Sequence, residues 1–596
     1  MSVLDRIERL RNVMEQQKID CYIIPTDDYH HSEYVGDYFK FREYITGFTG
    51  SAGTAVFTKD KAGLWTDGRY FIQAEAQLQG SGITLYKSGE PGVPTIEEFL
   101  KSELKEGDVL GFDGRTVTYA QGKRYCHITD ENGASLKYSL DFAQNIWKER
   151  PEMSMEPVFS LEDEYTGEKI GSKLERIREI MKENGCNAHV LSSLDDIAWL
   201  LNIRGNDIAY CPLVLSYAIV YNNSVELFAD IRKFSDDIIN LLAENQVKIY
   251  PYEDIYHKVS EMTSEDKLLL DSAIMNYSLY QAISKETVII DKQNPEILMK
   301  SVKNETQAEN LRKAHLKDAV AHTKFMYWLK KNIGRVEITE LSASARLEGL
   351  RAEQEHFLGP SFGPISAYGE HGAIVHYSAD EKSNVPLKEG KLFMTDTGGH
   401  YLEGSTDITR TVALGEVGNL EKEHFTLVAR AMLRLANTVF LYGCSGANLD
   451  CIAREIFWKE GLNFNHGTGH GVGYLLNIHE GPINFRWGEG ERPAPALEEN
   501  MVITDEPGIY IEGSHGIRLE NELLVRKTVK NEYGQFMNFE ILTYVPIDLD
   551  AILPEKMSTE EKEMLNHYHK QVYEKVSPYL SEEERIWLKE YTRAVK

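Results

Sequence analysis

Two stretches of the chain share one pattern of apolar and polar positions. Segment 4–28, LDRIERLRNVMEQQKIDCYIIPTDD, and segment 174–196, LERIREIMKENGCNAHVLSSLDD, each predict an amphipathic helix, a short turn and an apolar strand that ends in paired aspartates. The two copies begin about 170 residues apart, which is too far for a solenoid repeat. The spacing instead suits two related α/β domains.

The pattern between and after these copies predicts the remaining organisation. Short strands joined by Gly and Lys-Asp turns continue the first copy, and a hairpin with an Asn-Asn turn continues the second. An acidic linker near residue 150 separates the two copies, and a long helix with Asn304 as its N-cap begins near residue 300. We therefore expect an α/β (α+β) protein with domains at 1–152, 153–299 and 300–596, the last carrying a helical tail.

Charge and cysteine usage limit the partners and the compartment. The chain has 65 basic and 93 acidic side chains, a formal net charge of −28 that repels phosphate backbones, so we expect no nucleic acid or anionic membrane partner. It contains no apolar run of 18 residues, and its charged N-terminal helix lacks the apolar segment of a secretory signal. The six scattered cysteines show no CxxC spacing, which indicates reduced thiols in a cytoplasm.

Two predicted hairpins place acidic side chains in apolar strands. In KLFMTDTGGHYLEGSTDITRTVAL, a turn centred near Tyr401 and Leu402 would put Asp396 opposite Asp407. In MVITDEPGIYIEGSHGIRLENELLV, a turn near Gly513 would put Glu506 opposite Glu520. Like charges that face each other repel, so two such pairs in one domain require positive charge between them. The simpler alternative is a solvated acidic face.

The segment 465–480, NHGTGHGVGYLLNIHE, adds three histidines among four glycines. Any one of these histidines alone is consistent with a loop residue that satisfies local hydrogen bonds. A phosphate-binding loop is disfavoured, because the spacing does not match G-x-G-x-x-G and no Lys-Ser/Thr follows. A Ser-His-Asp triad also lacks support, because the chain contains no G-x-S-x-G elbow.

A pair of divalent metal ions accounts for the acidic pairs and the histidine together. Two Asp, two Glu and one imidazole, from His470, form a mostly hard ligand set rich in oxygen. Two ions held close together by such carboxylates would share a water of lowered pKa, ready to attack a carbonyl. The glycines around His470 let the backbone approach without a clash with Cβ.

The motifs that carry these residues resemble those of the pita-bread-fold metallopeptidases, which include methionine aminopeptidase, prolidase, creatinase and aminopeptidase P. The matching motifs are DTGGHYLEGSTDITRT, HGTGHGVGYLLNIHEGP, TDEPG and GIRLEN. In the N-terminal half, GFTGSAGTAVF, LWTDGRYF and WLLNIRGNDIAYCPLVLSYAIV resemble the two non-catalytic, creatinase-like domains of the long cytosolic-type Xaa-Pro aminopeptidases. The resemblance therefore covers nearly the whole chain and implies a C-terminal pita-bread catalytic domain.

The resemblance also assigns roles to individual residues. It implies five metal ligands with no substitution among them: Asp396, Asp407, His470, Glu506 and Glu520. Glu506 is further implied as the proton acceptor. Three other histidines would contact substrate or the tetrahedral intermediate, and a basic residue would lie behind the ligands: His376, His466, His479 and Arg518. The motifs do not extend over the interval between His479 and Glu506, so they assign no residues to the rim of the pocket.

The implied activity is hydrolysis of the bond between an N-terminal residue and a penultimate proline, with two divalent ions, Mn(II) by resemblance. The ligand set agrees with Mn(II) but does not exclude Zn, Co or Fe. The alternatives are a prolidase, which cuts Xaa-Pro dipeptides and has one fewer N-terminal domain, and an inactive pita-bread module that binds proteins. Methionine aminopeptidase lacks such long N-terminal extensions. The resemblance further implies a homodimer with the N-terminal domain as the contact.

Overall fold

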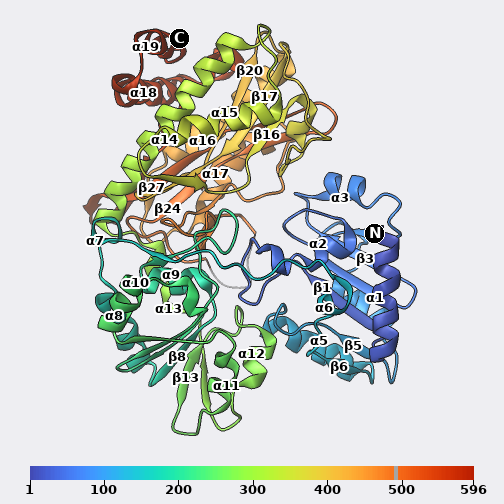
Figure 1. Ribbon diagram of the computed structural model, residues 1–596. Coiled ribbons are helices and arrows are strands. Elements are labelled where there is room, and N and C mark those ends of the chain that lie inside the picture. Colours follow the sequence, from blue (N-terminus) through green and yellow to red (C-terminus); the bar gives the residue numbers. More distant parts are fainter. Residues whose placement is uncertain (489–493) are drawn as a thin grey trace. The chain divides into compact units, whose positions relative to one another are not determined.

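The computed structural model describes residues 1–488 and 494–596, and the chain divides into two compact units (Figure 1). The first unit is Met1–Leu161 with Glu168–Glu296, and the second is Glu162–Gly167 with Ile297–Lys596. In the part of the chain that is described, no helix combines the length and the apolar character needed to cross a membrane. The six cysteines are all free thiols in the structure.

The first sheet of unit 1 has six strands in the order β4-β3-β2-β1-β5-β6. In this order the strands are Thr84–Lys87, Ala62–Thr66, Thr54–Thr58, Cys21–Pro25, Val109–Gly111 and Ser135–Lys137. The N-terminal helix α1 (Val3–Gln17) begins at a capping box on Ser2 and buries its apolar face through Ile7, Leu10 and Met14. The predicted amphipathic helix followed by a buried strand is thus confirmed for the first copy.

The second sheet of unit 1 also has six strands, in the order β12-β11-β10-β8-β13-β14. Its first strand in sequence, β8, occupies the same place in this order as β1 does in the first sheet. In this order the strands are Val247–Tyr250, Val225–Phe228, Tyr217–Tyr221, Ala188–Leu191, Lys267–Leu270 and Val288–Asp291. Helix α8 (Ile170–Glu183) precedes β8 as α1 precedes β1, and β10 and β11 form the hairpin predicted around the Asn-Asn turn. The internal similarity in sequence therefore corresponds to two similar sheets.

The boundary between the units falls within the short helix α13 (Pro295–Ser301). The long helix α14 (Glu305–Asn332) follows in unit 2, and its N-cap is Asn304, as predicted, in a capping box with Gln307. Helix α15 (Glu340–Ala352) packs along α14 (Figure 1). Two further helices, α16 (Asn419–Ala436) and α17 (Gly446–Trp458), cover the sheets and share one large apolar core with them. The tail forms α18 (Thr559–Val576) and α19 (Glu582–Tyr591).

Four sheets in unit 2 supply the strands that carry the candidate site. The largest has the order β21-β28-β27-β24-β22-β23: Phe440–Leu441, Gly534–Ile541, Asn521–Asn531, Val502–Asp505, Gly469–Gly471 and Glu480–Phe485. The others are β16-β17-β20 (Ile365–Tyr368, Lys391–Thr397, Ile408–Leu414), β15-β18-β19 (Phe357–Pro360, Gly399–Tyr401, Gly404–Ser405) and β25-β26 (Gly508–Ile511, His515–Arg518). The expected α/β fold class is confirmed.

Candidate metal centre

Five strand ends bring the predicted ligands together. Each residue lies inside a strand or within two residues of a strand end. Asp396 is in β17, His470 is in β22, and the other three lie just outside strands: Asp407 before β20, Glu506 after β24 and Glu520 between β26 and β27. The side chains of all five are buried or half-buried.

Donor atoms of these residues lie close enough to share a cation. One donor atom each from Asp407, His470 and Glu520 lies within 4.8 Å of the other two. The Nε2 atom of His470 is 3.5 Å from Oδ2 of Asp407 and 3.8 Å from Oε1 of Glu506. Separations of this size between two donors match the edges of a coordination shell with bonds of about 2.0–2.3 Å.

Asp396 has one oxygen that is held and one that has no hydrogen-bond partner among the described residues. Its Oδ2 accepts hydrogen bonds from Nε and Nη2 of Arg518, at 3.1 and 2.5 Å. Its Oδ1 is buried and makes no hydrogen bond in the part of the chain that is described. A buried carboxylate oxygen without a donor is costly unless a cation meets it. The residues present therefore fit a metal ion.

The electrostatics of the cluster point to the same requirement. Burial raises the pKa of Asp407 and of Glu520 well above the usual carboxyl range, and the neighbouring carboxylates raise both further. Burial also raises the pKa of Glu506 to about 7, although His470 and Arg518 oppose this shift. These carboxylates destabilise one another when ionised, so a divalent cation would be their natural counter-charge.

Arg518 links the cluster to two of the other predicted site residues. Its Nη1 donates to the Tyr510 hydroxyl at 2.6 Å, and that hydroxyl lies 2.9 Å from Nε2 of His466. Its Nη2 donates to the backbone oxygen of Val375 at 3.3 Å, and His376 is the next residue. The guanidinium is 2% exposed, so these contacts are shielded from solvent. His466 therefore reaches the cluster through Tyr510 and Arg518.

His479 lies directly beside His470. The two imidazole rings are edge to face, with centroids 4.2 Å apart and planes at 86°. The structure thus brings His479 to the proposed ligand His470, and it connects His376 and His466 to the cluster through Arg518. It gives no catalytic role to any of them, and these roles remain predictions.

The predicted register of one acidic hairpin is wrong by two residues. Asp396 pairs with Thr409, not with Asp407, because the turn is centred between Leu402 and Glu403 rather than at Tyr401 and Leu402. The register predicted for the second hairpin is correct, since Gly508 pairs with Arg518 and the same alignment extends to Glu506 and Glu520. Part of the pocket rim between His479 and Glu506, residues 489–493, lies outside the described residues.

Sequence reasoning missed several polar residues that hold the cluster from behind. Oε1 of Glu522 accepts the backbone N–H of Asp407 at 2.7 Å, and its Oε2 is 3.1 Å from Nε2 of the buried His315. Lys303 forms a buried ion pair with Glu480, the neighbour of His479. The period-two alternation of Arg518, Glu520 and Glu522 was a signal for Glu522, whereas Lys303 and His315 had none.

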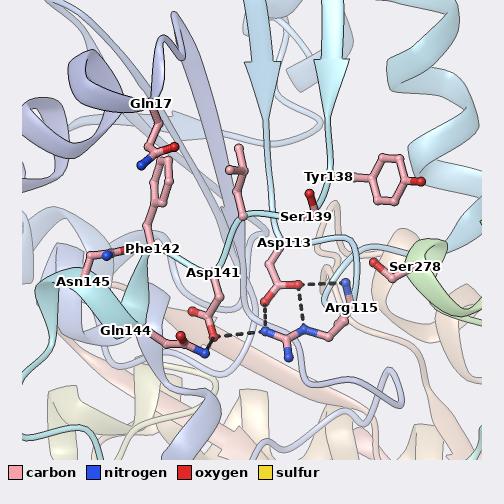
Figure 2. Close-up of a pocket in the computed structure, with 11 residues that line it drawn as sticks. Gln17, Asp113, Arg115, Tyr138, Ser139, Asp141, Phe142, Gln144, Asn145 and Ser278 are labelled. Atoms are coloured by element: carbon pink, nitrogen blue, oxygen red, sulfur yellow. Dashed lines mark hydrogen bonds and ion pairs between the residues drawn. The ribbon is translucent and has the colours of Figure 1, made fainter. Parts of the chain in front are cut away.

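A separate cavity of about 460 Å³ lies in unit 1, next to the ends of β5 and β6 (Figure 2). Its charged groups pair with one another. Arg115 binds both oxygens of Asp113, at 3.0 and 2.8 Å, and Oδ2 of Asp141 at 3.0 Å, and Arg150 binds Asp141 at 2.9 Å. Because these charges are already satisfied, the cavity does not indicate a class of ligand.

Comparison with known proteins places the chain in a family. Residues 309–527 match metallopeptidase family M24, residues 535–595 match the C-terminal region of peptidase M24, and residues 6–136 and 149–307 match the creatinase/prolidase N-terminal domain. The chain belongs to the M24 metallopeptidases with creatinase-type N-terminal domains. The resemblance read from the motifs is therefore confirmed.

Individual relatives match over the full length. Xaa-Pro aminopeptidase 1 of Dictyostelium discoideum is 36% identical over 97% of this chain and 94% of its own, and aminopeptidase P1 of Arabidopsis thaliana is 34% identical over 99% of both. The crystal structure of X-prolyl aminopeptidase from Caenorhabditis elegans, described as a cytosolic enzyme with a di-nuclear active site, superposes with a TM-score of 0.95 at 33% identity over both whole chains.

Proposed function

We propose that this metallopeptidase is a Xaa-Pro aminopeptidase, which removes the first residue of a peptide whose second residue is proline. The observation that carries the proposal is the full-length match to proteins of that name, over both N-terminal domains and the catalytic domain. By contrast, the Xaa-Pro dipeptidase of Bacillus anthracis has the same fold over only 64% of this chain while using 99% of its own. The match of both N-terminal domains to full-length Xaa-Pro aminopeptidases favours the aminopeptidase over the prolidase alternative.

We further propose that Asp396, Asp407, His470, Glu506 and Glu520 hold two divalent ions. The proximity of their donor atoms, the partnerless Oδ1 of Asp396 and the mutual repulsion of the carboxylates support this ligand set. When bound, such ions polarise a scissile carbonyl and lower the pKa of water. Mn(II) is the proposed metal because four of the five side chains offer oxygen, which suits a hard cation.

The remaining side chains act on the substrate and its protons. An oxygen of Glu506 would accept a proton from the attacking water and pass it to the proline nitrogen as the amide bond breaks. His376, His466 and His479 would donate hydrogen bonds to the oxyanion that develops on the carbonyl oxygen. Arg518 fixes Oδ2 of Asp396, which leaves Oδ1 for a cation.

Proline in the second position explains why a dedicated enzyme is needed. The Xaa-Pro amide has no N–H, and the ring fixes φ near −65°. A peptidase that recognises an N–H at this position cannot bind such a substrate productively. We propose a peptide with a free N-terminus and a penultimate proline as the substrate.

The proposal also includes the domain boundaries, the cellular location and the oligomeric state. The domain boundaries 1–152, 153–299 and 300–596 are supported by the two separate sheets of unit 1 and by the ranges of the family models. A cytoplasmic location is supported by the description of the C. elegans relative as cytosolic. A homodimer follows from the family resemblance alone, and light scattering on the purified protein tests it.

A product analysis tests the activity. The Mn-loaded protein is incubated with a proline-second tripeptide and, separately, with an Xaa-Pro dipeptide, and the products are read by mass spectrometry. Release of only the first residue from the tripeptide supports the aminopeptidase. Hydrolysis restricted to the dipeptide would instead assign a prolidase. A protein that binds no metal and cleaves neither peptide would be an inactive binding module.

A further inference from the structure

Glu340 is a fully buried acidic residue that neither the motifs nor the ligand set includes. It is the first residue of α15, where the helix dipole favours a negative charge. A buried carboxylate is costly unless hydrogen-bond donors surround it. The identity of those donors shows what the residue holds in place.

Among the described residues, the four donors to the Glu340 carboxylate all come from one segment, residues 368–385. Oε1 accepts hydrogen bonds from the backbone N–H of Tyr368 and from Nδ1 of His371, both at 2.8 Å. Oε2 accepts from the Tyr377 hydroxyl at 2.9 Å and from the backbone N–H of Val385 at 3.4 Å. A single side chain thus fixes the start, the middle and the end of this segment.

The same segment carries His376, and the metal centre holds it from the other side. The backbone oxygen of Val375, the preceding residue, accepts a hydrogen bond from Nη2 of Arg518, the atom that also donates to Asp396. Tyr377, the following residue, is bound to Glu340. The backbone of His376 is therefore anchored on one side by the proposed metal-binding network and on the other by Glu340.

The backbone of this segment also packs closely against strand β26. The short helix η3 (Gly369–Ala373) lies against β26, and a Cβ atom added to Gly516 would come within 1.6 Å of the backbone oxygen of Gly372. The segment is pressed onto β26 at this point, while Glu340 holds it from α15. A change at Glu340 therefore shifts the segment relative to a fixed strand.

We propose that Glu340 is a positioning residue that sets the location of His376 over the reaction centre. The inference rests on the proposed function, since it takes the role of His376 from there. A misplacement of about 1 Å in a group that acts on the transition state costs on the order of 100-fold in rate. Because only part of the segment is released in a single variant, we expect a fall in kcat of about 10-fold with KM nearly unchanged.

Two variants separate positioning from loss of the fold. Glu340→Gln keeps the size of the side chain but turns one of its two acceptors into an amide donor, which then faces donors from the segment. Tyr377→Phe removes only the hydroxyl that joins Glu340 to the neighbour of His376. Glu561→Gln is the matched control, because Glu561 is 2% exposed, is bound to Arg430 and Ser558, and lies in α18.

The test is a double-mutant cycle with His376→Ala, measured as kcat and KM on a proline-second peptide, as Mn content and as thermal midpoint. We expect Glu340→Gln and Tyr377→Phe to retain the Mn content and to lower kcat, while Glu561→Gln keeps wild-type kcat. In the His376→Ala background, neither variant should lower kcat more than about twofold further. If Glu340→Gln does not fold, Tyr377→Phe and its double variant decide the question.

Three results would overturn the inference. Losses that multiply in the double variants would show that Glu340 acts independently of His376. A loss of Mn in Glu340→Gln would place its effect on the metal ligands. Wild-type kcat in His376→Ala would remove the residue through which Glu340 is proposed to act. Cleavage of the proline-second peptide by the wild-type protein tests the proposed activity separately from all three.

Discussion

The buried ion pair between Arg351 and Asp318 lies behind the proposed metal centre, and its loss should lower both stability and Mn affinity. Nε of Arg351 donates to Oδ1 of Asp318 at 2.7 Å, and the two side chains are 3% and 0% exposed. Each partner also touches a residue next to a proposed ligand. Nη2 of Arg351 donates to the backbone oxygen of Thr397, which follows Asp396, and Oδ2 of Asp318 accepts from the hydroxyl of Thr406, which precedes Asp407.

Replacement of Asp318 by Asn should therefore damage both stability and metal binding. The variant keeps the shape of the side chain but leaves the Arg351 guanidinium buried without a counter-charge, a situation that costs about 3–5 kcal/mol. We expect the lower end, about 3 kcal/mol, because the amide oxygen can still accept one hydrogen bond. The loosened contacts to Thr397 and Thr406 should weaken Mn binding by about 10- to 100-fold.

The assay follows unit 2 by itself and includes a matched control. Unfolding in urea is monitored by hydrogen exchange of peptides from α14 and α15, and Mn affinity is measured by calorimetry on the folded apoprotein. Asp548→Asn breaks another buried pair in the same unit, with Lys330 at 2.6 Å, and should lower stability without lowering Mn affinity. The double variant Asp318→Asn/Arg351→Met should recover part of the lost stability, since it leaves no unpaired charge.

Two outcomes would refute this reasoning. A loss of stability below about 1 kcal/mol in Asp318→Asn would mean that the guanidinium is solvated or finds another partner. An equal loss of Mn affinity in Asp318→Asn and in Asp548→Asn would mean that the effect is general destabilisation and not the contacts to Thr397 and Thr406.

Further predictions concern the histidines, the pH dependence of unit 1 and metal removal. His470→Ala should lose Mn, whereas His479→Ala should keep Mn and lose kcat; an empty site in His479→Ala would reverse these roles. Burial lowers the pKa of Lys173 to about 7. Between pH 7 and 10 the Lys173 amine is protonated in the unfolded state but largely neutral in the folded state. Raising the pH therefore favours the folded state, and the free energy of unfolding of unit 1 should rise by about 2 kcal/mol from pH 7 to 9. Urea unfolding should show this rise in the wild type but not in Lys173→Met, and equal slopes would contradict it. Mn at about 100 times its Kd for each of the two proposed sites should raise the midpoint of unit 2 by about 8 °C in calorimetry, an increase that chelation reverses. An unchanged midpoint would contradict binding to the folded unit.

Local signals in the sequence predicted the elements whose boundaries depend on nearby residues. The start of α14 was predicted because Asn304 is a favourable N-cap residue, and the structure adds a capping box with Gln307 three residues on. The hairpin of β25 and β26 was placed in register because Gly513, with φ of +70°, fixes the centre of its turn. In both cases the information lies within a few residues.

The register predicted for the first acidic hairpin was wrong because a local irregularity shifts its turn. The chain is interrupted at Gly398, where an added Cβ would lie 1.8 Å from the backbone oxygen of Thr406, and it resumes as β18 and β19. The turn then falls one residue later than predicted, between Leu402 and Glu403, and an error of one residue in the turn moves the pairing by two. The cluster still assembles, because Asp407 reaches it from just outside β20.

The residues that support the site from behind could not be predicted from the sequence. Asp318 lies 88 residues from Thr406, and its carboxylate accepts a hydrogen bond from the Thr406 hydroxyl. Glu340 lies on a helix 37 residues before Tyr377. Neither residue belongs to a motif or breaks an apolar pattern in a way that marks it, so only the tertiary contacts show what they hold.

The central claim is that five side chains bind two cations together, and the most direct measurement is the stoichiometry of Mn binding. Equilibrium dialysis followed by elemental analysis should give two Mn per wild-type chain, and no more than one for Asp407→Asn or Glu520→Gln at the same free Mn concentration. A wild-type protein that binds no Mn, or ligand variants that still bind two, would contradict the claim.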